Sequence, residues 1–333
     1  MCRKMTRFCK FPFGKSLILK GKPESRTYNK SFLFHNSLYD SNVKLIKSSS
    51  YAVGETLDGV FNSRIYAPET PILNSFSNEI IDNSFWLGYF HAHYGHFLLS
   101  TLQRLWKIDQ KKDFIIAPSF DESLINNLDY IGIILDALEI DVNKIISPSS
   151  GCELRNITVN QSSFVENYFC YPMWGDFMRG ISKKIISDNC GSLSETPVYI
   201  SRSRMKSGTR FFEGEECVSE TLKKFGIETV YVEEMSFKEQ LDFWNRNKIF
   251  IGFSGSSFIT SSFFGNKKLI ILHHDDYVFG SQLMVDVSSN NKTAYINVEN
   301  FISRNLEKEN VFKIINCEAI ISDIINSIRI MGN

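Results

Sequence analysis

The stretch from residue 198 to residue 272 constrains the fold most, because short apolar runs alternate in it with runs at helical spacing. The apolar runs, which predict buried strands, are residues 198–201, 229–232, 249–253 and 269–272. The runs between them, which predict helices, are residues 215–225, 237–247 and 256–264. Strands that alternate with helices of about ten residues form a parallel sheet with right-handed connections.

Residues suited to helix ends stand where this pattern requires them. Gly226 follows the first predicted helix and predicts a left-handed C-terminal cap. Ser236 and Glu239 have the spacing of a capping box at the start of the next helix. These residues strengthen the prediction of an α/β fold for the second half of the chain.

The first half of the chain shows a weaker alternation of the same kind. Predicted helices cover residues 94–106 and 123–138, and predicted strands cover residues 84–89, 113–117 and 144–146. We expect short strands and loops before residue 80, an irregular stretch over residues 147–195, and a helix over residues 318–330. The length of 333 residues suits two domains. We predict domains of residues 1–188 and 189–305, closed by a C-terminal helical segment of residues 306–333.

Composition excludes several classes of partner. Lys and Arg number 37 and Asp and Glu number 37, so the net charge of 0 argues against nucleic acid. A local patch that binds a membrane surface remains an alternative. No Cys-x-x-Cys pair, convincing signal peptide or run of 18 apolar residues is present. We therefore predict a cytoplasmic protein without a structural metal, with the inner face of the membrane as the alternative location.

The turn after residues 249–253 is the first candidate binding site. Gly252 and Gly255 let backbone approach a ligand closely, and Ser254, Ser256 and Ser257 offer hydroxyl groups beside a new helix. Free N–H groups and the positive end of a helix dipole bind phosphate. The alternative is a tight turn between strand and helix, with serines that cap the helix.

A basic loop is the second candidate. Arg202 follows a predicted strand, and Arg210 and Glu215 come shortly after it. In open α/β sheets, ligands bind at the carboxyl ends of strands, where an arginine can hold a pyrophosphate through two hydrogen bonds. A solvated loop is the alternative. Because Arg202 and Ser254 follow strands of one predicted sheet, a shared site is favoured.

Histidines form the remaining candidates. His91, His93 and His96 precede a predicted helix, where they could act as a base, contact a substrate or stabilise the core. A zinc site would need a further ligand that the neighbouring residues do not supply. His273 and His274 follow the strand that we take as the last of the parallel set. They could contact a sugar or nucleotide, or merely end that strand.

In their order, three blocks of sequence resemble the glycosyltransferase 61 family, which includes bacterial capsule and lipopolysaccharide enzymes and secretory-pathway O-GlcNAc transferases. The blocks are residues 94–105, then Arg202 with 209–210 and 215–216, and lastly Phe237 and Gln240 with 249–257. Five positions depart from the family pattern. Ser100 replaces an acidic residue, Gly214 an asparagine, Ser254 a histidine, Thr260 an asparagine or histidine, and Ile271 a glutamate.

The resemblance implies a GT-B-like enzyme with two Rossmann-like domains that face each other across a cleft. It would transfer a hexosyl or N-acetylhexosaminyl group from a nucleotide-sugar to a capsule, lipopolysaccharide or O-antigen type acceptor, with inversion and without metal or cofactor. The acceptor would bind the N-terminal domain and the donor the C-terminal domain. A non-catalytic protein that binds glycans or nucleotides on the same fold is the alternative.

The resemblance also implies roles for the candidate residues. His96, His93 and Arg202 would be catalytic, and His91 and Tyr94 would lie on the acceptor side. The donor-binding residues would be Arg202, Arg210, Glu215, Gly252, Ser254, Gly255, Ser256 and Ser257.

Overall fold

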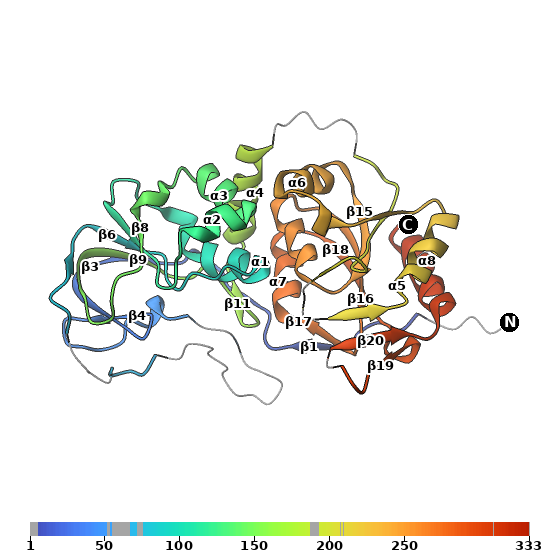
Figure 1. The fold of residues 1–333 in the computed structure, drawn as a ribbon, viewed down its shortest axis with the longest axis horizontal. Helices are drawn as coiled ribbons and strands as arrows, with labels where there is room; N and C mark the ends of the chain where they lie inside the picture. The colour runs from blue at the N-terminus through green and yellow to red at the C-terminus, as the bar shows by residue number, and fades with distance from the viewer. Residues whose placement is uncertain are drawn as a thin grey trace. The chain divides into compact units, whose positions relative to one another are not determined.

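The computed structural model describes residues 6–51, 54, 67–71, 76–186, 193–206, 208, 210–308 and 310–332 (Figure 1). These residues form a mixed α/β structure of two compact units. The N-terminal unit is Gly14–Ile185, and the C-terminal unit is Ile186–Asn333 together with the segment that precedes Gly14. No helix in the described ranges has both the length and the apolar character needed to cross a membrane.

A five-stranded parallel sheet forms the centre of the C-terminal unit, with the strand order β14-β12-β15-β16-β18. The strands are β12 (Val198–Ile200), β14 (Glu228–Val230), β15 (Ile249–Phe253), β16 (Lys268–His273) and β18 (Lys292–Asn297). The chain passes from β12 to β14 on one side and then returns to β15 on the other side. The boundary between β12 and β15 is therefore the topological switch point, where open α/β sheets bind ligands.

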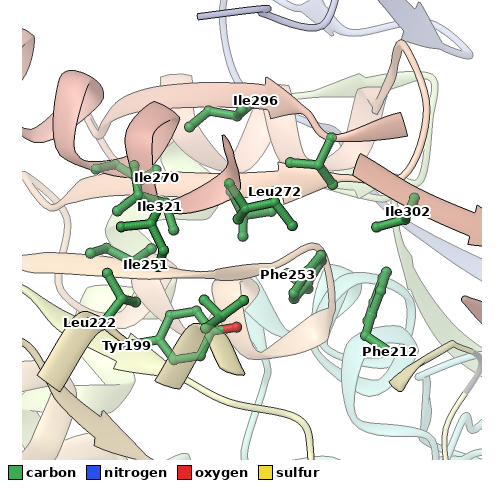
Figure 2. Close-up of a cluster of buried hydrophobic side chains, with 14 of the residues drawn as sticks. Tyr199, Phe212, Leu222, Ile251, Phe253, Ile270, Leu272, Ile296, Ile302 and Ile321 are labelled. Atoms are coloured by element: carbon green, nitrogen blue, oxygen red, sulfur yellow. The ribbon is translucent and has the colours of Figure 1, made fainter. Parts of the chain in front are cut away.

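Helices cover both faces of this sheet. One face carries α5 (Glu215–Lys224) and α8 (Cys317–Gly332), and their apolar residues pack with alternate residues of the strands (Figure 2). The other face packs against α6 (Phe237–Arg246) and the 3₁₀-helix η6 (Ser256–Phe263), and η6 in turn contacts α7 (Gly280–Ser288). Successive strand residues point to opposite faces, so the two apolar clusters share the same strands.

Most predicted elements of this unit are confirmed. The capping box of Ser236 and Glu239 is formed, and Gly226 adopts a left-handed φ of 75°. The prediction that His273 follows the last parallel strand is wrong, because His273 ends β16 and β18 extends the sheet further. Smaller elements complete the unit: η5 (Val232–Glu234), η7 (Glu299–Phe301), β17 (Tyr277–Phe279), and the sheet of β13 (Phe211–Glu213), β20 (Val311–Ile314) and β19 (Ile302–Arg304).

Residues 6–13, here called the N-terminal strap, lie on the C-terminal unit, whereas the predicted boundary groups them with the N-terminal domain. Within the strap, β1 (Phe11–Phe13) pairs in parallel with β17. The amide of Asn297 donates to the Arg7 carbonyl at 2.9 Å, and the amide of Cys9 donates to the Tyr295 carbonyl at 2.9 Å. The strap thus covers β18, the edge strand of the sheet, whose backbone groups would otherwise lack partners.

The N-terminal unit is built on a mixed sheet with the order β4-β3-β9-β6-β7-β8, in which β5 also pairs with β9. Its strands are β3 (Ser25–Phe34), β4 (Ser37–Asp40), β5 (Ile80–Ile81), β6 (Ser84–Trp86), β7 (Phe114–Ile116), β8 (Ile145–Ile146) and β9 (Glu153–Asn160). A smaller sheet holds β10 (Phe164–Val165), β11 (Phe169–Cys170) and β2 (Leu17–Ile18). The prediction of an irregular stretch over residues 147–195 is wrong at β9, which lies at the centre of the main sheet.

The helix predicted over residues 94–106 is present but is not regular. It begins as α1 (Tyr94–His96), widens into the π-helical turn η2 (Phe97–Thr101) and ends as the 3₁₀-helix η3 (Leu102–Lys107). The other helical segments of the unit are η1 (Lys47–Ser49), α2 (Ser123–Asn127), α3 (Asp129–Ala137), η4 (Val142–Lys144) and α4 (Met173–Ile185). Single π-helical turns inside helices occur frequently at functional sites.

Candidate functional site

In the C-terminal unit, the structure brings Arg202, Arg210 and the 254–255 turn together at the switch point. The guanidinium of Arg202, which follows β12, donates through Nη1 to the Ser254 carbonyl at 2.6 Å. Its Nη2 donates to the Arg210 carbonyl at 3.2 Å. The side chain that sequence reasoning placed beside the turn therefore binds the backbone of that turn. These contacts link the ends of β12 and β15, the two strands that border the switch point.

The two glycines of the turn are explained by close packing. A Cβ atom at Gly252 would lie 2.7 Å from the Ile200 carbonyl oxygen and 3.3 Å from the Phe258 ring. A Cβ atom at Gly255 would lie 2.5 Å from Nη1 of Arg202. Gly252 thus permits the close approach of β12, β15 and η6, and Gly255 permits the guanidinium to lie against the turn.

Glu215 supports this loop from inside the unit. Its side chain is buried, and its Oε1 accepts hydrogen bonds from the Tyr199 hydroxyl at 2.9 Å and from the Arg202 amide at 2.9 Å. Burial raises the pKa of Glu215, while these hydrogen bonds and the Arg202 charge oppose that rise. Gly214 precedes it with a φ of 84°, a left-handed conformation that glycine and asparagine tolerate. The asparagine that the resemblance predicts at this position would tolerate the same conformation.

The two arginines of this cluster, Arg202 and Arg210, are partly buried cations that form no salt bridge with the residues that the structure describes. Burial lowers the pKa of both Arg202 and Arg210, although a guanidinium does not lose its proton in proteins. Among the described residues, no carboxylate lies within salt-bridge distance of either guanidinium, although more distant carboxylates attract both charges. Arg204 differs, because it pairs with Glu234 at 3.0 Å on the surface. The reading as a solvated basic loop thus fits Arg204, whereas Arg202 and Arg210 have the environment of an anion site.

The helix that follows the turn adds backbone donors. η6 begins at Ser256, and no side chain caps its first turn. The serines of residues 254, 256 and 257 are half-buried and do not serve as the predicted caps. Uncapped N–H groups at a helix start bind anions, and the dipole strengthens that binding.

His273 and His274 lie at the end of β16, next to the basic cluster. Burial, together with the charges of His274 and Arg210, lowers the pKa of His273 to about 3. Burial and Arg210 likewise lower the pKa of His274 to about 4. The Nε2 atom of His273 is buried and has no hydrogen-bond partner among the described residues. Both rings are therefore neutral near pH 7 and contribute no charge to the site.

In the N-terminal unit, the three clustered histidines lie together. The ring centroid of His96 is 5.7 Å from that of His91 and 5.4 Å from that of His93. His91 also contacts the rings of Tyr51 at 4.5 Å and Tyr89 at 4.6 Å. Across the ranges that the structure describes, no three His, Cys, Asp or Glu side chains are placed to hold a metal ion.

Glu166 joins this cluster, and sequence reasoning missed it. Its Oε1 lies 2.7 Å from Nδ1 of His96 and also accepts a hydrogen bond from the Ser100 hydroxyl. Burial alone would raise the pKa of Glu166, but the hydrogen bonds and charge of His96, together with Ser100, lower it overall. Ser100, where the resemblance predicts an acidic residue, thus contacts a carboxylate from elsewhere in the chain.

Two other residues of the first block have packing roles. The Tyr94 ring contacts Tyr130 at 5.1 Å. Arg104 is buried, and its Nη2 donates to the carbonyls of Ser48 and Ser50, each at 2.9 Å. Burial lowers the pKa of Arg104 to about 10. This arginine therefore joins the helix to residues 48–50.

The remaining departures from the family pattern lie in the C-terminal unit. Ile271 is in the middle of β16 and belongs to the apolar cluster beneath α6 and η6. Thr260 is buried within η6. Gln240 donates to the Met235 carbonyl at 3.2 Å and so stabilises the start of α6. Thr209, part of the second block, lies outside the described residues.

Comparison with known proteins agrees with these observations. No curated protein matches the chain. The model of the family described as Glycosyltransferase 61 matches residues 94–271, which is more than half of the 333 residues and includes His96, Glu166 and the Arg202 loop. The histidine helix, the Arg202 loop and the 252–257 turn thus fall within one family match, and the chain belongs to the glycosyltransferase 61 family.

Proposed function

We propose that this glycosyltransferase uses a nucleotide-sugar donor and transfers its sugar to a hydroxyl group of a surface glycan, with inversion and without a metal. Family membership supports glycosyl transfer. The observation that carries the donor assignment is the pair of arginines near the switch point, because neither forms a salt bridge with a carboxylate among the described residues. A diphosphate has the charge and the oxygen geometry that two guanidinium groups bind well.

The donor diphosphate would bind Arg202, Arg210 and the start of η6, with the serines of the turn as further hydrogen-bond donors. Bond breaking at the anomeric carbon sends an electron pair to the departing diphosphate oxygen. Cationic groups placed at that oxygen stabilise the transition state most, because the charge develops there. Glu215 would act behind Arg202, since it holds the Arg202 amide and is itself buried.

The acceptor hydroxyl must lose its proton as its oxygen attacks the anomeric carbon. His96 is our candidate for the base, and His93 is the alternative. Attack opposite to the leaving diphosphate inverts the anomeric centre. By resemblance to the family, we assign the donor to the C-terminal unit and the acceptor to the N-terminal unit, near His91 and Tyr94, in a GT-B type architecture.

The finer assignments rest on the same resemblance. We propose a hexosyl or N-acetylhexosaminyl donor and an acceptor of the bacterial capsule, lipopolysaccharide or O-antigen type. We also propose a cytoplasmic location, with peripheral attachment to the inner face of the membrane as the alternative.

The test is a binding and transfer assay with Arg202→Ala and a panel of nucleotide-sugars. Loss of charge-assisted hydrogen bonds worth about 1.5–3 kcal/mol should weaken donor binding about 10- to 150-fold. Isothermal titration with the donor and its nucleoside diphosphate measures this change. Arg204→Ala is the matched control, because Arg204 is exposed and paired with Glu234. It should bind the donor as the wild type does.

Two results would contradict the proposal. Equal losses in the Arg202 and Arg204 variants would show a general charge effect instead of a diphosphate site. Donor binding without transfer to any glycan or lipid-linked acceptor would favour a non-catalytic nucleotide-binding protein on the same fold.

A further inference from the structure

We infer that Glu166 is a positioning residue that orients His96 as the base and places its carboxylate where an acidic side chain at position 100 would lie. This inference rests on the proposed function, in which His96 takes the proton of the acceptor hydroxyl. It concerns a residue that lies 70 positions from His96 in sequence and contacts it at 2.7 Å.

The first observation is that two residues of one helical turn meet the same carboxylate oxygen. His96 ends α1, and Ser100 lies within the π-helical turn that follows. Residues four apart lie on one side of a helix. Both His96 Nδ1 and Ser100 Oγ contact Oε1 of Glu166. The side chain of an acidic residue at position 100 would project along the same direction as the Ser100 hydroxyl. The Glu166 carboxylate lies beside that hydroxyl, so it occupies the corresponding region but comes from outside the helix.

The second observation is that the Glu166 backbone is held in place. Glu166 follows β10 and begins the turn to β11, which the Tyr168 amide closes on the Val165 carbonyl at 3.1 Å. Asn167 in this turn has a left-handed φ of 53°. The Glu166 carbonyl also accepts from the Gly54 amide at 2.7 Å. A carboxylate on so restricted a backbone can serve as a rigid reference for the histidine ring.

The third step concerns the proton on the imidazole. An ionised carboxylate only accepts hydrogen bonds, so the ring nitrogen that faces it must carry hydrogen. Glu166 is ionised near pH 7, because its pKa is lowered below the ordinary value despite burial. Its partner Nδ1 therefore holds a proton, so that whenever the ring acts as a base its lone pair is on Nε2. A carboxylate that fixes the tautomer of a catalytic histidine is an established way to prepare a base.

The experiment compares Glu166→Ala, Glu166→Gln and the double variant Ser100→Asp/Glu166→Ala with the wild type. The first readout is the His96 tautomer, measured by nitrogen NMR of ¹⁵N-histidine-labelled protein, which needs no substrate. We expect the Nδ1–H form in the wild type and in the double variant. Free neutral imidazole favours the Nε2–H form, so we expect that form to increase in Glu166→Ala.

The second readout separates binding from chemistry. In both single variants kcat should fall by about 10- to 100-fold, which is less than the 10²–10⁴-fold that a whole general base contributes, because the imidazole itself remains. The donor KM should stay within about twofold, because the arginine cluster is intact. The double variant should recover most of the lost kcat. Glu139→Gln is the matched control, since Glu139 is an exposed carboxylate paired with Lys184, and it should change neither readout.

An unchanged tautomer or an unchanged kcat in Glu166→Ala would overturn the inference. A double variant no better than Glu166→Ala would overturn the equivalence of the two positions. If Glu166→Ala does not fold, the kcat of Glu166→Gln tests the inference instead, and an unchanged kcat in that variant would overturn it. The double variant, if it folds, provides the second measurement of the tautomer and of kcat. Failure of the proposed function would appear differently, as a wild type that binds no nucleotide-sugar and transfers none, while the tautomer measurement would still report on Glu166 and His96.

Discussion

Gly252 shows how one residue can carry both a packing and a binding role. Its missing side chain lets the Ile200 carbonyl and the Phe258 ring approach the strand. The same close approach brings the end of β12, with Arg202, to the start of the turn at Ser254. The tight-turn and phosphate-site readings of this segment are therefore compatible, because the tight turn places the groups that would bind phosphate.

We predict that Gly252→Ala destabilises the protein by about 1–3 kcal/mol, the usual cost of extra volume in a packed core. The added methyl group would meet a backbone oxygen at 2.7 Å, which can move only if β12 and β15 separate. Urea denaturation measures the free energy of unfolding. The control is Gly180→Ala within α4, where nothing lies within 4 Å of the added atom. It should be neutral or slightly stabilising, and equal effects of the two substitutions would contradict the prediction.

The buried histidines predict a pH dependence of stability. Burial lowers the pKa of His273 to about 3 and that of His274 to about 4, whereas an unfolded histidine titrates near 6.5. As the pH falls from about 6.5 towards these values, the unfolded state binds protons that the folded state does not, so stability falls. At pH 5 one such histidine costs about 2 kcal/mol.

The measurement is the free energy of unfolding in urea at pH 7 and pH 5 for the wild type and His273→Gln. The variant should lose less stability between these values, because one buried titratable ring is gone. Parallel pH profiles of the two proteins would rule out a role for His273.

At the scale of elements, the helix of the first block shows what periodicity can and cannot reveal. Apolar spacing correctly predicts a helix that begins at Tyr94 and ends near Lys107. It does not predict the π-helical turn at Phe97–Thr101. All five residues of that turn are buried, so the pattern of burial fits an α-helical turn and a π-helical turn equally well. That turn contains Ser100, so the irregular part of the helix is also the part that meets Glu166.

The N-terminal strap provides a prediction at this scale. Deletion of residues 1–13 should expose the edge of β18, where the Asn297 amide now donates to the Arg7 carbonyl. One backbone hydrogen bond contributes about 0.5–1.5 kcal/mol, so amides of β18 should exchange hydrogen up to about tenfold faster. Hydrogen exchange followed by mass spectrometry measures this effect. Peptides from β9 in the N-terminal unit are the internal control and should not change; equal acceleration there would indicate general unfolding.

At the scale of the whole molecule, the C-terminal sheet was more predictable than the N-terminal one for a physical reason. Buried parallel strands such as Ile249–Phe253 form continuous apolar runs between helices. β9 alternates buried and exposed residues incompletely, and it pairs with β3, which lies more than a hundred residues earlier. Nothing local marks such a strand.

The candidate site likewise contains residues that the sequence could group together and one that it could not. Arg202 and Ser254 could be grouped from sequence, because the carboxyl ends of parallel strands meet at one edge of a sheet. Glu166 could not, because a contact across 70 residues leaves no spacing pattern in the chain. The one recognisable hint was the serine at position 100, a polar residue at a place where the resemblance led us to expect a negative charge.

The strap also sets an order of events during synthesis. Arg7 pairs with Asp276, a separation of 269 residues, and the strap groups with the C-terminal unit although the N-terminal unit follows it directly in the chain. Residues 14–185 can fold while translation continues, but the strap must wait until β18 has emerged. At about 5–20 residues per second, that interval is on the order of 15 to 60 seconds, during which the phenylalanines of the strap are exposed to chaperones and to other nascent chains.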